Sequence, residues 1–151
     1  MPSVFEPAVR DQLVARLAKL TPGTPAKWGK FTATKMVAHV NDALLMAIGD
    51  LPVAPKRSKL RSAFGRWFAI YAPIPWPKSV PTAPELLSRG AKDGVQFDVE
   101  RSRFTELVGK VAARKGAAHW PDHPIFGPMR EKDWGALGCR HIDHHFKQFD
   151  I

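Results

Sequence analysis

Cysteine is almost absent from this chain, because Cys139 is the one cysteine among 151 residues. A single cysteine excludes an internal disulfide framework and a cysteine-rich zinc ribbon, and it fits a reducing compartment. No uncharged apolar run approaches the roughly 18 residues that a membrane-spanning helix needs. The N-terminal residues carry no basic segment followed by an apolar one, as a secretory signal would. We therefore expect a cytoplasmic protein without a membrane span.

Strand-like alternation of apolar and polar residues is also scarce, since Val95, Phe97 and Val99 form the one candidate. The length of 151 residues fits one domain, and 44% hydrophobic and 25% charged residues are an ordinary globular composition. Proline is in excess, with 14 residues in clusters that mark connections between elements. These features predict a single all-α domain over residues 1–151 with long proline-rich connections.

Apolar residues at helical spacing recur between the proline clusters. We expect helices over residues 7–20, 59–71 and 131–149, and a helix that begins at an N-cap, either Thr32 or Thr34, and stops near Gly49. Another helix is expected from an N-cap at Asp98 to a stop at Gly116, and one further turn at residues 85–89. The helix over residues 59–71 is expected to pack against the other helices through a stripe formed by Leu60, Phe64, Trp67, Phe68 and Tyr71. Four principal helices with long connections predict an antiparallel four-helix bundle.

Three of the six histidines lie in the last predicted helix. At roughly 100° per residue, His141 and His145 lie on one inward stripe, one turn apart, and His144 lies on its shoulder. Such a pair can direct two nitrogen atoms at one metal ion, although core histidines bonded to backbone or water remain an alternative. His39, at the edge of the apolar stripe of the second predicted helix, is the candidate for a third ligand.

Two segments resemble the DinB-like (DinB/YfiT) superfamily. Residues 28–39, WGKFTATKMVAH, resemble its segment of a tryptophan, a threonine and a helix with one histidine, and residues 131–149 resemble its closing helix. Residues 81–86 and 123–127 resemble a branch of unknown function. The resemblance implies a four-helix bundle that holds one divalent metal ion through three histidines, which match His39, His141 and His145. Better-studied members include S-transferases that use bacillithiol or mycothiol and a thiol-dependent isomerase.

Three imidazole ligands and an open position would suit a catalytic rather than a structural ion, with Zn²⁺ or Ni²⁺ favoured over Mg²⁺. We expect a metal-dependent enzyme that acts on a small molecule by thiol transfer, with a low-molecular-weight thiol, or by metal-assisted hydrolysis. The alternatives are a metal-free binding module and a basic accessory protein of nucleic acids or membrane surfaces. A homodimer is also left open.

The remaining histidines have other predicted roles. His123 lies in a proline-rich loop and can be a fourth ligand, a proton shuttle or a structural cap, of which we favour the cap. His119 and His144 are expected to face solvent.

The sequence also predicts roles for four further residues close to these histidines in the chain. Asp42 lies one turn after His39 and either accepts a hydrogen bond from its imidazole or is solvated. Cys139 lies on the flank of its helix, away from the histidines, and is not expected to be a nucleophile. Trp28 and Trp134 are expected to anchor the core, since aromatic side chains bury a large area.

Basic residues outnumber acidic ones by 23 to 14, which gives a formal net charge of +9. The densest group, Lys56, Arg57, Lys59 and Arg61, lies at the start of a predicted helix. Basic residues next to aromatic ones can bind nucleic acids or anionic membranes. Because the segment contains no recognised nucleic-acid motif, we favour a solvated basic face without specific nucleic-acid binding.

Overall fold

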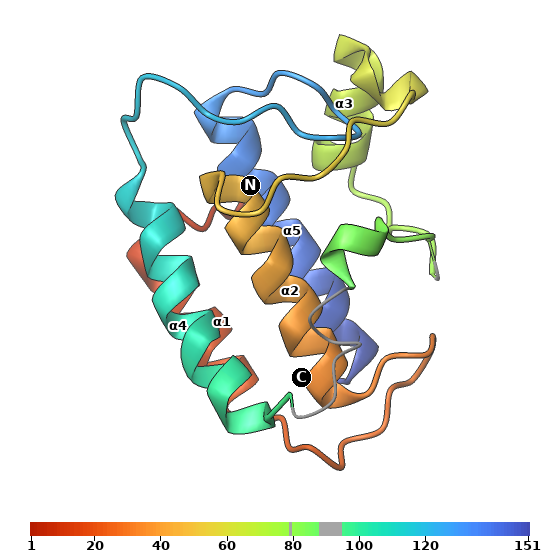
Figure 1. Ribbon diagram of the computed structural model, residues 1–151, viewed down its shortest axis with the longest axis vertical. Helices are drawn as coiled ribbons and strands as arrows, with labels where there is room; N and C mark the ends of the chain where they lie inside the picture. The colour runs from red at the N-terminus through yellow and green to blue at the C-terminus, as the bar shows by residue number, and fades with distance from the viewer. Residues whose placement is uncertain (79, 88–94) are drawn as a thin grey trace.

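The computed structural model describes residues 1–78, 80–87 and 95–151, and every regular element in these ranges is helical (Figure 1). In chain order the elements are α1 (Pro7–Leu17), α2 (Ala33–Ile48), the 3₁₀ turn η1 (Lys59–Arg61), α3 (Ala63–Tyr71), the 3₁₀ turn η2 (Pro84–Leu86), α4 (Phe97–Ala113) and α5 (Glu131–Gln148). The all-α expectation is confirmed for this part of the chain. None of these helices is long and apolar enough to cross a membrane.

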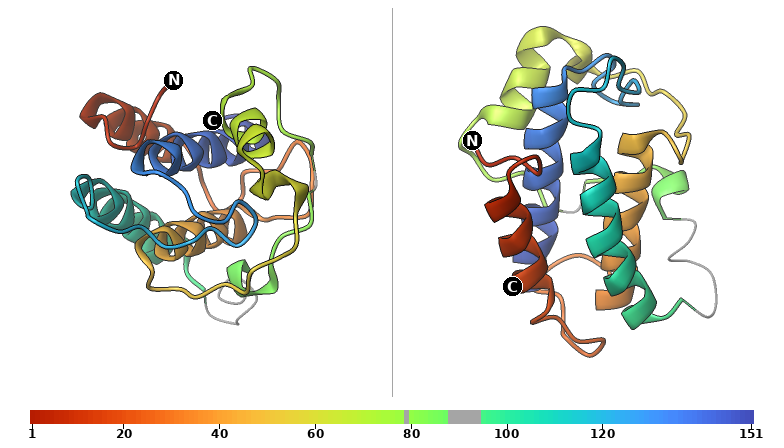
Figure 2. Two further views of the ribbon diagram at one scale, coloured as in Figure 1. Left: turned by 90° about the horizontal axis from the view of Figure 1, so that it is seen from above. Right: turned by 90° about the vertical axis from the view of Figure 1, so that its left-hand side faces the viewer.

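Four of the helices, α1, α2, α4 and α5, lie side by side along the long axis of the molecule (Figure 1). Seen from above, α1 and α5 form one row, and α4 and α2 form the other (Figure 2). Helix α2 packs against both α4 and α5, and α1 also packs against both. Helix α3 lies outside this group and contacts the N-terminal part of α5. The arrangement places α2 and α5, the two helices that carry the candidate metal ligands, next to each other.

The ends of α2 are fixed by local hydrogen bonding and backbone geometry. The hydroxyl of Thr32 accepts a hydrogen bond from the backbone N–H of Lys35, which satisfies one of the unpaired donors of the first turn. Gly49 ends the helix in the left-handed conformation with φ of 90°, which glycine adopts without strain. Both ends agree with the boundaries predicted from the sequence.

The start of α5 is fixed by Asp133, whose carboxylate accepts hydrogen bonds from the backbone N–H and the side chain of Arg130. The helix ends at Gln148, within one residue of the predicted end. The histidines of α5 therefore lie on a continuous helix of 18 residues.

The core lies between these four helices and contains large, fully buried side chains from each of them. Among the largest are Leu17, Met36, Phe104, Leu107, Ile142 and Phe146. A second, smaller cluster lies beneath α3 and consists of Ile70, Phe126, Ala136 and Leu137. Trp134 is buried in the main core, as predicted.

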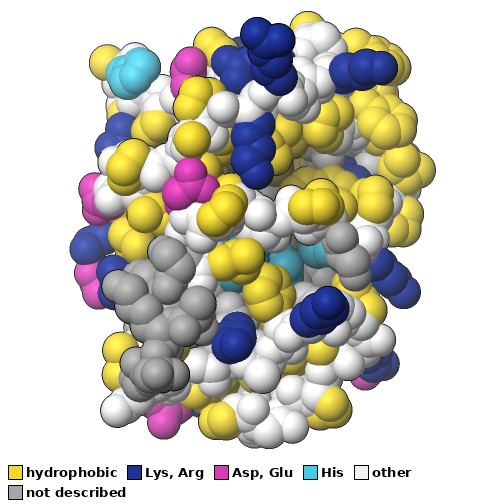
Figure 3. Space-filling view, turned by 45° about the vertical axis from the view of Figure 1, so that its right-hand side comes forward, with side chains coloured by type: hydrophobic (Ala, Val, Ile, Leu, Met, Phe, Trp, Pro, Cys, Tyr) yellow, Lys and Arg dark blue, Asp and Glu magenta, His cyan; other side chains and the backbone are white. Residues whose placement is uncertain are grey.

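The predicted continuous helix over residues 59–71 is wrong in two respects. The backbone is extended at Ser62, whose hydroxyl caps α3 by accepting the N–H of Gly65, so the short turn η1 and the helix α3 are separate. The expected apolar stripe also packs inward only in part: Leu60 and Tyr71 contact the smaller cluster, whereas Phe64, Trp67 and Phe68 are 73%, 53% and 44% exposed. Hydrophobic side chains accordingly gather at the surface around α3 (Figure 3). Ile70 is the residue that α3 buries.

The region around α4 departs from the sequence-based boundaries. The N-cap is Gln96 rather than Asp98, and α4 ends at Ala113, before Gly116. Val95, Phe97 and Val99, which are too few to build a sheet, form no strand, because Phe97 and Val99 lie in the first turn of α4. The turn expected at residues 85–89 overlaps η2, while Ser88 and Arg89 lie outside the described residues.

Candidate metal centre

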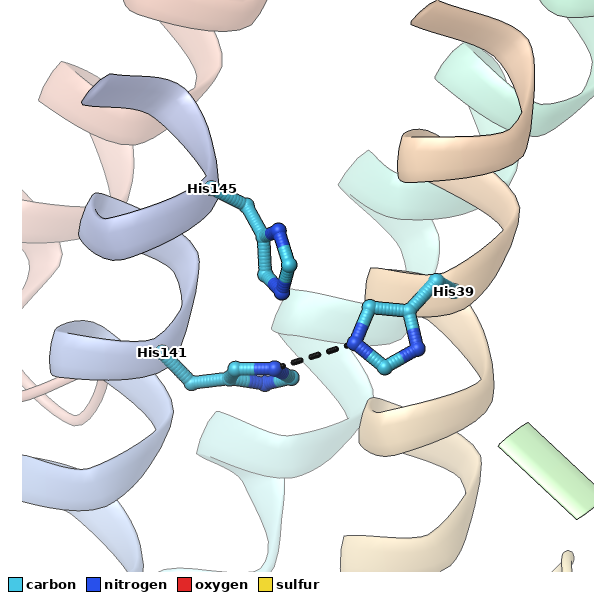
Figure 4. A group of neighbouring side chains, drawn as sticks. All are labelled: His39, His141 and His145. Carbon is cyan, nitrogen blue, oxygen red and sulfur yellow. Dashed lines mark hydrogen bonds between the residues drawn. The ribbon is translucent and has the colours of Figure 1, made fainter. Parts of the chain in front are cut away.

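His39, His141 and His145 converge between α2 and α5 (Figure 4). Each offers one ring nitrogen, and these three atoms all lie within 4.8 Å of one another. The closest pair consists of the Nε2 atoms of His39 and His141, which are 3.2 Å apart although 102 residues separate them in the chain. The convergence expected from the sequence is confirmed, and the three side chains lie close enough to hold one metal ion.

Hydrogen bonds on the far side of two rings direct their other nitrogen into the centre. The Nδ1 atom of His39 lies 3.1 Å from the carbonyl oxygen of Leu86 in η2, and a carbonyl only accepts. The Nδ1 atom of His145 lies 2.9 Å from Oε1 of Gln148, whose Nε2 donates to the carbonyl oxygen of Trp28 at 2.7 Å. Both Nδ1 atoms therefore carry the proton, and both Nε2 atoms keep a lone pair for a ligand.

The spacing of the closest pair suits a shared ion. Nitrogen ligands about 2.0–2.1 Å from a tetrahedral Zn²⁺ lie about 3.3 Å from each other. The Nε2 atoms of His39 and His141 are 3.2 Å apart, close to that separation. Two nitrogen atoms at this distance need either a proton between them or a cation beside them, because their lone pairs otherwise repel.

Burial keeps the three imidazoles neutral near pH 7. Loss of hydration is the main cause that lowers the pKa of His39, and it lowers the pKa of His141 well below the usual value. Burial and the neighbouring His39 lower the pKa of His145 to about 3. A neutral imidazole has a lone pair available for a metal ion, so the site is ready to bind without first losing protons.

Aromatic side chains line the approach to the three histidines. The ring of Phe31 stacks on His39, with centroids 5.2 Å apart, and the ring of Trp76 lies 6.1 Å from that of His141. In the space-filling view, histidine side chains are visible at the base of a hollow bordered by hydrophobic side chains (Figure 3). Part of the histidine surface is therefore visible from solvent on this face, although His39 and His145 are only 4% and 8% exposed.

Two residues at the rim differ from the sequence-based expectation. His144 is half-buried rather than solvent-facing, because its ring lies 6.1 Å from Trp28, 5.7 Å from Trp76 and 5.3 Å from His145. Trp28 is half-buried at the rim rather than anchored in the core, with the ammonium of Lys78 over its ring. Helical periodicity could not reveal either contact, because both depend on where distant loops pass. His119 is exposed, as predicted.

His123 has the structural role favoured from the sequence. Its ring is buried beside Trp134, and its Nδ1 atom accepts the backbone N–H groups of Ile125 and Phe126 at 3.1 and 3.3 Å. Burial lowers the pKa of His123 to about 4, so its ring is neutral at pH 7. It does not belong to the group of converging histidines and caps its loop instead.

Asp42 and Cys139 are both buried. The solvated alternative for Asp42 is therefore wrong, and the atom that faces Nδ1 of His39 is the carbonyl oxygen of Leu86. Burial raises the pKa of the Cys139 thiol to about 11, so it is protonated and unreactive near neutral pH, as expected.

Sequence reasoning missed three parts of the centre: the Leu86 carbonyl, Gln148 as the partner of His145, and Trp76. A signal existed only for Gln148, because its position three residues after His145 brings the two side chains together on a helix.

Comparisons with models of protein families, with curated proteins and with solved structures found no match to this chain.

Proposed function

We propose that this protein is a DinB-like four-helix bundle, formed by α1, α2, α4 and α5, that binds one divalent transition-metal ion and uses it in catalysis. His39, His141 and His145 are the ligands. The observation that carries the proposal is the convergence of three ring nitrogens within 4.8 Å, with the closest pair 3.2 Å apart.

The chain itself offers a contrast between a structural and a metal-binding histidine. The buried ring of His123 satisfies its Nδ1 atom with backbone N–H groups of its own loop. In His39 and His145, by contrast, Nδ1 is used for a supporting hydrogen bond and Nε2 is left directed at other histidines. This second pattern is that of metal ligands, whose outer nitrogen usually donates to a carbonyl or carboxylate.

The donor set favours Zn²⁺ or Ni²⁺, because imidazole suits these ions better than it suits Mg²⁺ or Ca²⁺. When bound, such an ion lowers the pKa of a coordinated water or thiol and so supplies a nucleophile near neutral pH. Three neutral protein ligands leave the charge of the ion uncompensated and one position open. The reaction classes that fit are thiol S-transfer with a low-molecular-weight thiol and hydrolysis.

The residues around the centre have roles in this proposal. Trp28 and Trp76 form an aromatic rim that binds the apolar part of a small substrate. His144 lies between them, and burial lowers its pKa, so that its neutral ring is suited to accept a proton from the nucleophile. Phe31 covers His39 and His145 and limits access of bulk water to the ligands.

The test is metal content and metal affinity of protein prepared without a histidine tag. We expect one equivalent of Zn²⁺ or Ni²⁺ by elemental analysis, and a loss of affinity above about 100-fold in His39→Ala, His141→Ala and His145→Ala. The exposed His119→Ala is the matched control and should bind like the wild type. Circular dichroism should show an unchanged helical content, because the core supplies its own stability.

Two results would contradict the proposal in different ways. Stoichiometric metal that survives the combined loss of His141 and His145 would reject the ligand set. Metal binding without metal-dependent consumption of a thiol by an electrophile, and without hydrolysis of activated esters or amides, would reject the catalytic role but keep the metal site.

A further inference from the structure

The outer face of α3 is an exposed aromatic cluster. The ring of Phe64 lies 6.2 Å from that of Trp67 and 6.3 Å from that of Phe68, so the three form one continuous group. All three side chains are exposed, whereas isolated exposed apolar residues are the usual case at a protein surface. Helix α3 also protrudes from the end of the molecule (Figures 1 and 2). An exposed aromatic face on a protruding helix is suited to contact another surface.

The chain segment that contains this cluster is rich in basic residues. Residues 51–84 contain no aspartate or glutamate and six basic residues, Lys56, Arg57, Lys59, Arg61, Arg66 and Lys78. Lys56, Arg57 and Lys59 are exposed. Their segment adjoins the cluster, because a Cβ atom on Gly65 of α3 would lie 2.7 Å from the carbonyl oxygen of Lys59.

Two further arginines hold α3 in place rather than serve as free charges. The guanidinium of Arg61 donates to the carbonyl oxygen of Pro124, and that of Arg66 donates to those of Phe126 and Pro128. These bonds tie η1 and α3 to the loop before α5. The aromatic cluster is therefore presented on a supported helix.

We propose that η1 and α3 dock this protein on the surface of an anionic lipid bilayer. Phe64, Trp67 and Phe68 insert into the boundary between headgroups and acyl chains, where aromatic side chains are favoured. Lys56, Arg57 and Lys59 contact the acidic headgroups, which attract juxtamembrane basic residues. The nine-residue helix α3 is too short to span a bilayer, so the association is peripheral. This inference is independent of the metal centre.

Charge and shape favour a bilayer over other occupants. Three aromatic side chains cover much less than the roughly 800 Å² per partner of a stable protein interface. A symmetric dimer through this face would also bring two cationic segments together. Single-stranded nucleic acids bind in basic grooves with aromatic platforms, whereas this cluster lies on a protruding helix.

The test is co-sedimentation of the full chain with vesicles of phosphatidylcholine containing about 30% phosphatidylserine, compared with phosphatidylcholine alone. We expect binding to the anionic vesicles that weakens steeply as salt rises. The triple variants F64S/W67S/F68S and K56Q/R57Q/K59Q should each lose at least about tenfold in affinity. The control K19Q/K30Q/K35Q removes the same charge from exposed lysines elsewhere and should change affinity less than about twofold.

Several outcomes would overturn the inference. These are equal binding to neutral and anionic vesicles, no binding to either, or a loss in the control equal to that in K56Q/R57Q/K59Q. A dimer that F64S/W67S/F68S dissociates, or tight oligonucleotide binding that competes with vesicles, would assign the face to another partner. If the aromatic variant does not fold, K56Q/R57Q/K59Q still decides, because its exposed side chains contribute little to packing.

Discussion

Polar side chains are buried between α2 and α5, whereas aromatic side chains are exposed on α3. At the first place, His39, His145 and Gln148 are almost completely removed from solvent. At the second, Phe64 and Trp67 project outward although a core of other residues lies directly beneath their helix. Both arrangements reverse the usual distribution, in which apolar residues are inside and polar ones outside.

The two regions differ in how this reversal is stabilised. Between α2 and α5, hydrogen bonds from Nδ1 of His39 and of His145 support the buried rings. On α3, arginine side chains bonded to a neighbouring loop hold the helix, while the aromatic side chains of its outer face stay largely exposed. The side chains of the first region therefore point inward, toward the three converging ring nitrogens, and the aromatic side chains of the second point outward. Local departures from the burial rule of this kind are typical of functional sites.

The largest effect we expect on stability comes from the inner face of α3. Ile70→Ala should lower the free energy of unfolding by about 2–5 kcal/mol, because Ile70 is 0% exposed and packs with Phe126 and Leu137. Denaturant unfolding followed by circular dichroism measures the change. A loss below about 1 kcal/mol would mean that the smaller cluster does not anchor α3.

The next effect is a dependence of stability on pH that arises in the loop beneath α3. The pKa of His123 is about 4 in the folded protein, against 6.5 for an ordinary histidine. As pH falls, His123 therefore takes up a proton in the unfolded chain before it does so in the folded protein. This difference should lower the free energy of unfolding by up to about 3 kcal/mol between pH 6.5 and pH 4. Above pH 6.5 this contribution is fully present.

Unfolding experiments across this pH range, with His123→Gln beside the wild type, measure the contribution. The amide oxygen of glutamine can still accept the loop N–H groups, so the variant should lose stability less steeply with acid. His119→Gln is the matched control, because His119 is exposed. Equal slopes for the wild type and His123→Gln would contradict the low pKa.

Sequence periodicity was sufficient for the histidines and insufficient for α3, for a physical reason. Helix α2 is long, capped at both ends and packed on two neighbours, so the direction of His39 follows from the stripe around it. The shared direction of His141 and His145 on α5 follows in the same way, because residues four apart lie on one face of a helix. Tertiary packing brings the two helices together into one centre. The sequence indicated this packing only through the resemblance of residues 28–39 and 131–149 to the DinB-like superfamily.

Periodicity failed on α3 because a regular apolar stripe does not specify whether it faces the core. Helix α3 has nine residues and contacts η1 and α5 only, among the helical elements. Its orientation is set by Ile70 and by the bonds of Arg61 and Arg66 to a loop 60 or more residues away in the chain. Contacts of this range leave no local signal in the sequence.

A smaller effect is expected on metal affinity from residues that support the ligands. Gln148→Leu removes the acceptor of the His145 Nδ1 proton, and Gly29→Ala places a Cβ atom 2.6 Å from Nε2 of Gln148 at a backbone position with φ of 79°. Each should weaken Zn²⁺ binding by about 10–100-fold without removing a ligand. Gly23→Ala is the control, because a Cβ atom there meets nothing within 4 Å. Unchanged affinity in both variants would mean that His145 is positioned by packing alone.

The smallest effect is expected on the outer face of α3, where Phe64→Ser should change the free energy of unfolding by less than about 0.5 kcal/mol. Phe64 is mostly exposed, so the folded protein gains little from burying its ring, in contrast to Ile70 on the same helix. Denaturant unfolding of Phe64→Ser and Ile70→Ala side by side measures the difference directly. A loss in Phe64→Ser as large as that in Ile70→Ala would mean that the aromatic cluster is covered in solution. A small loss would mean that selection for stability does not explain three aromatic residues on this face, because the fold does not depend on them.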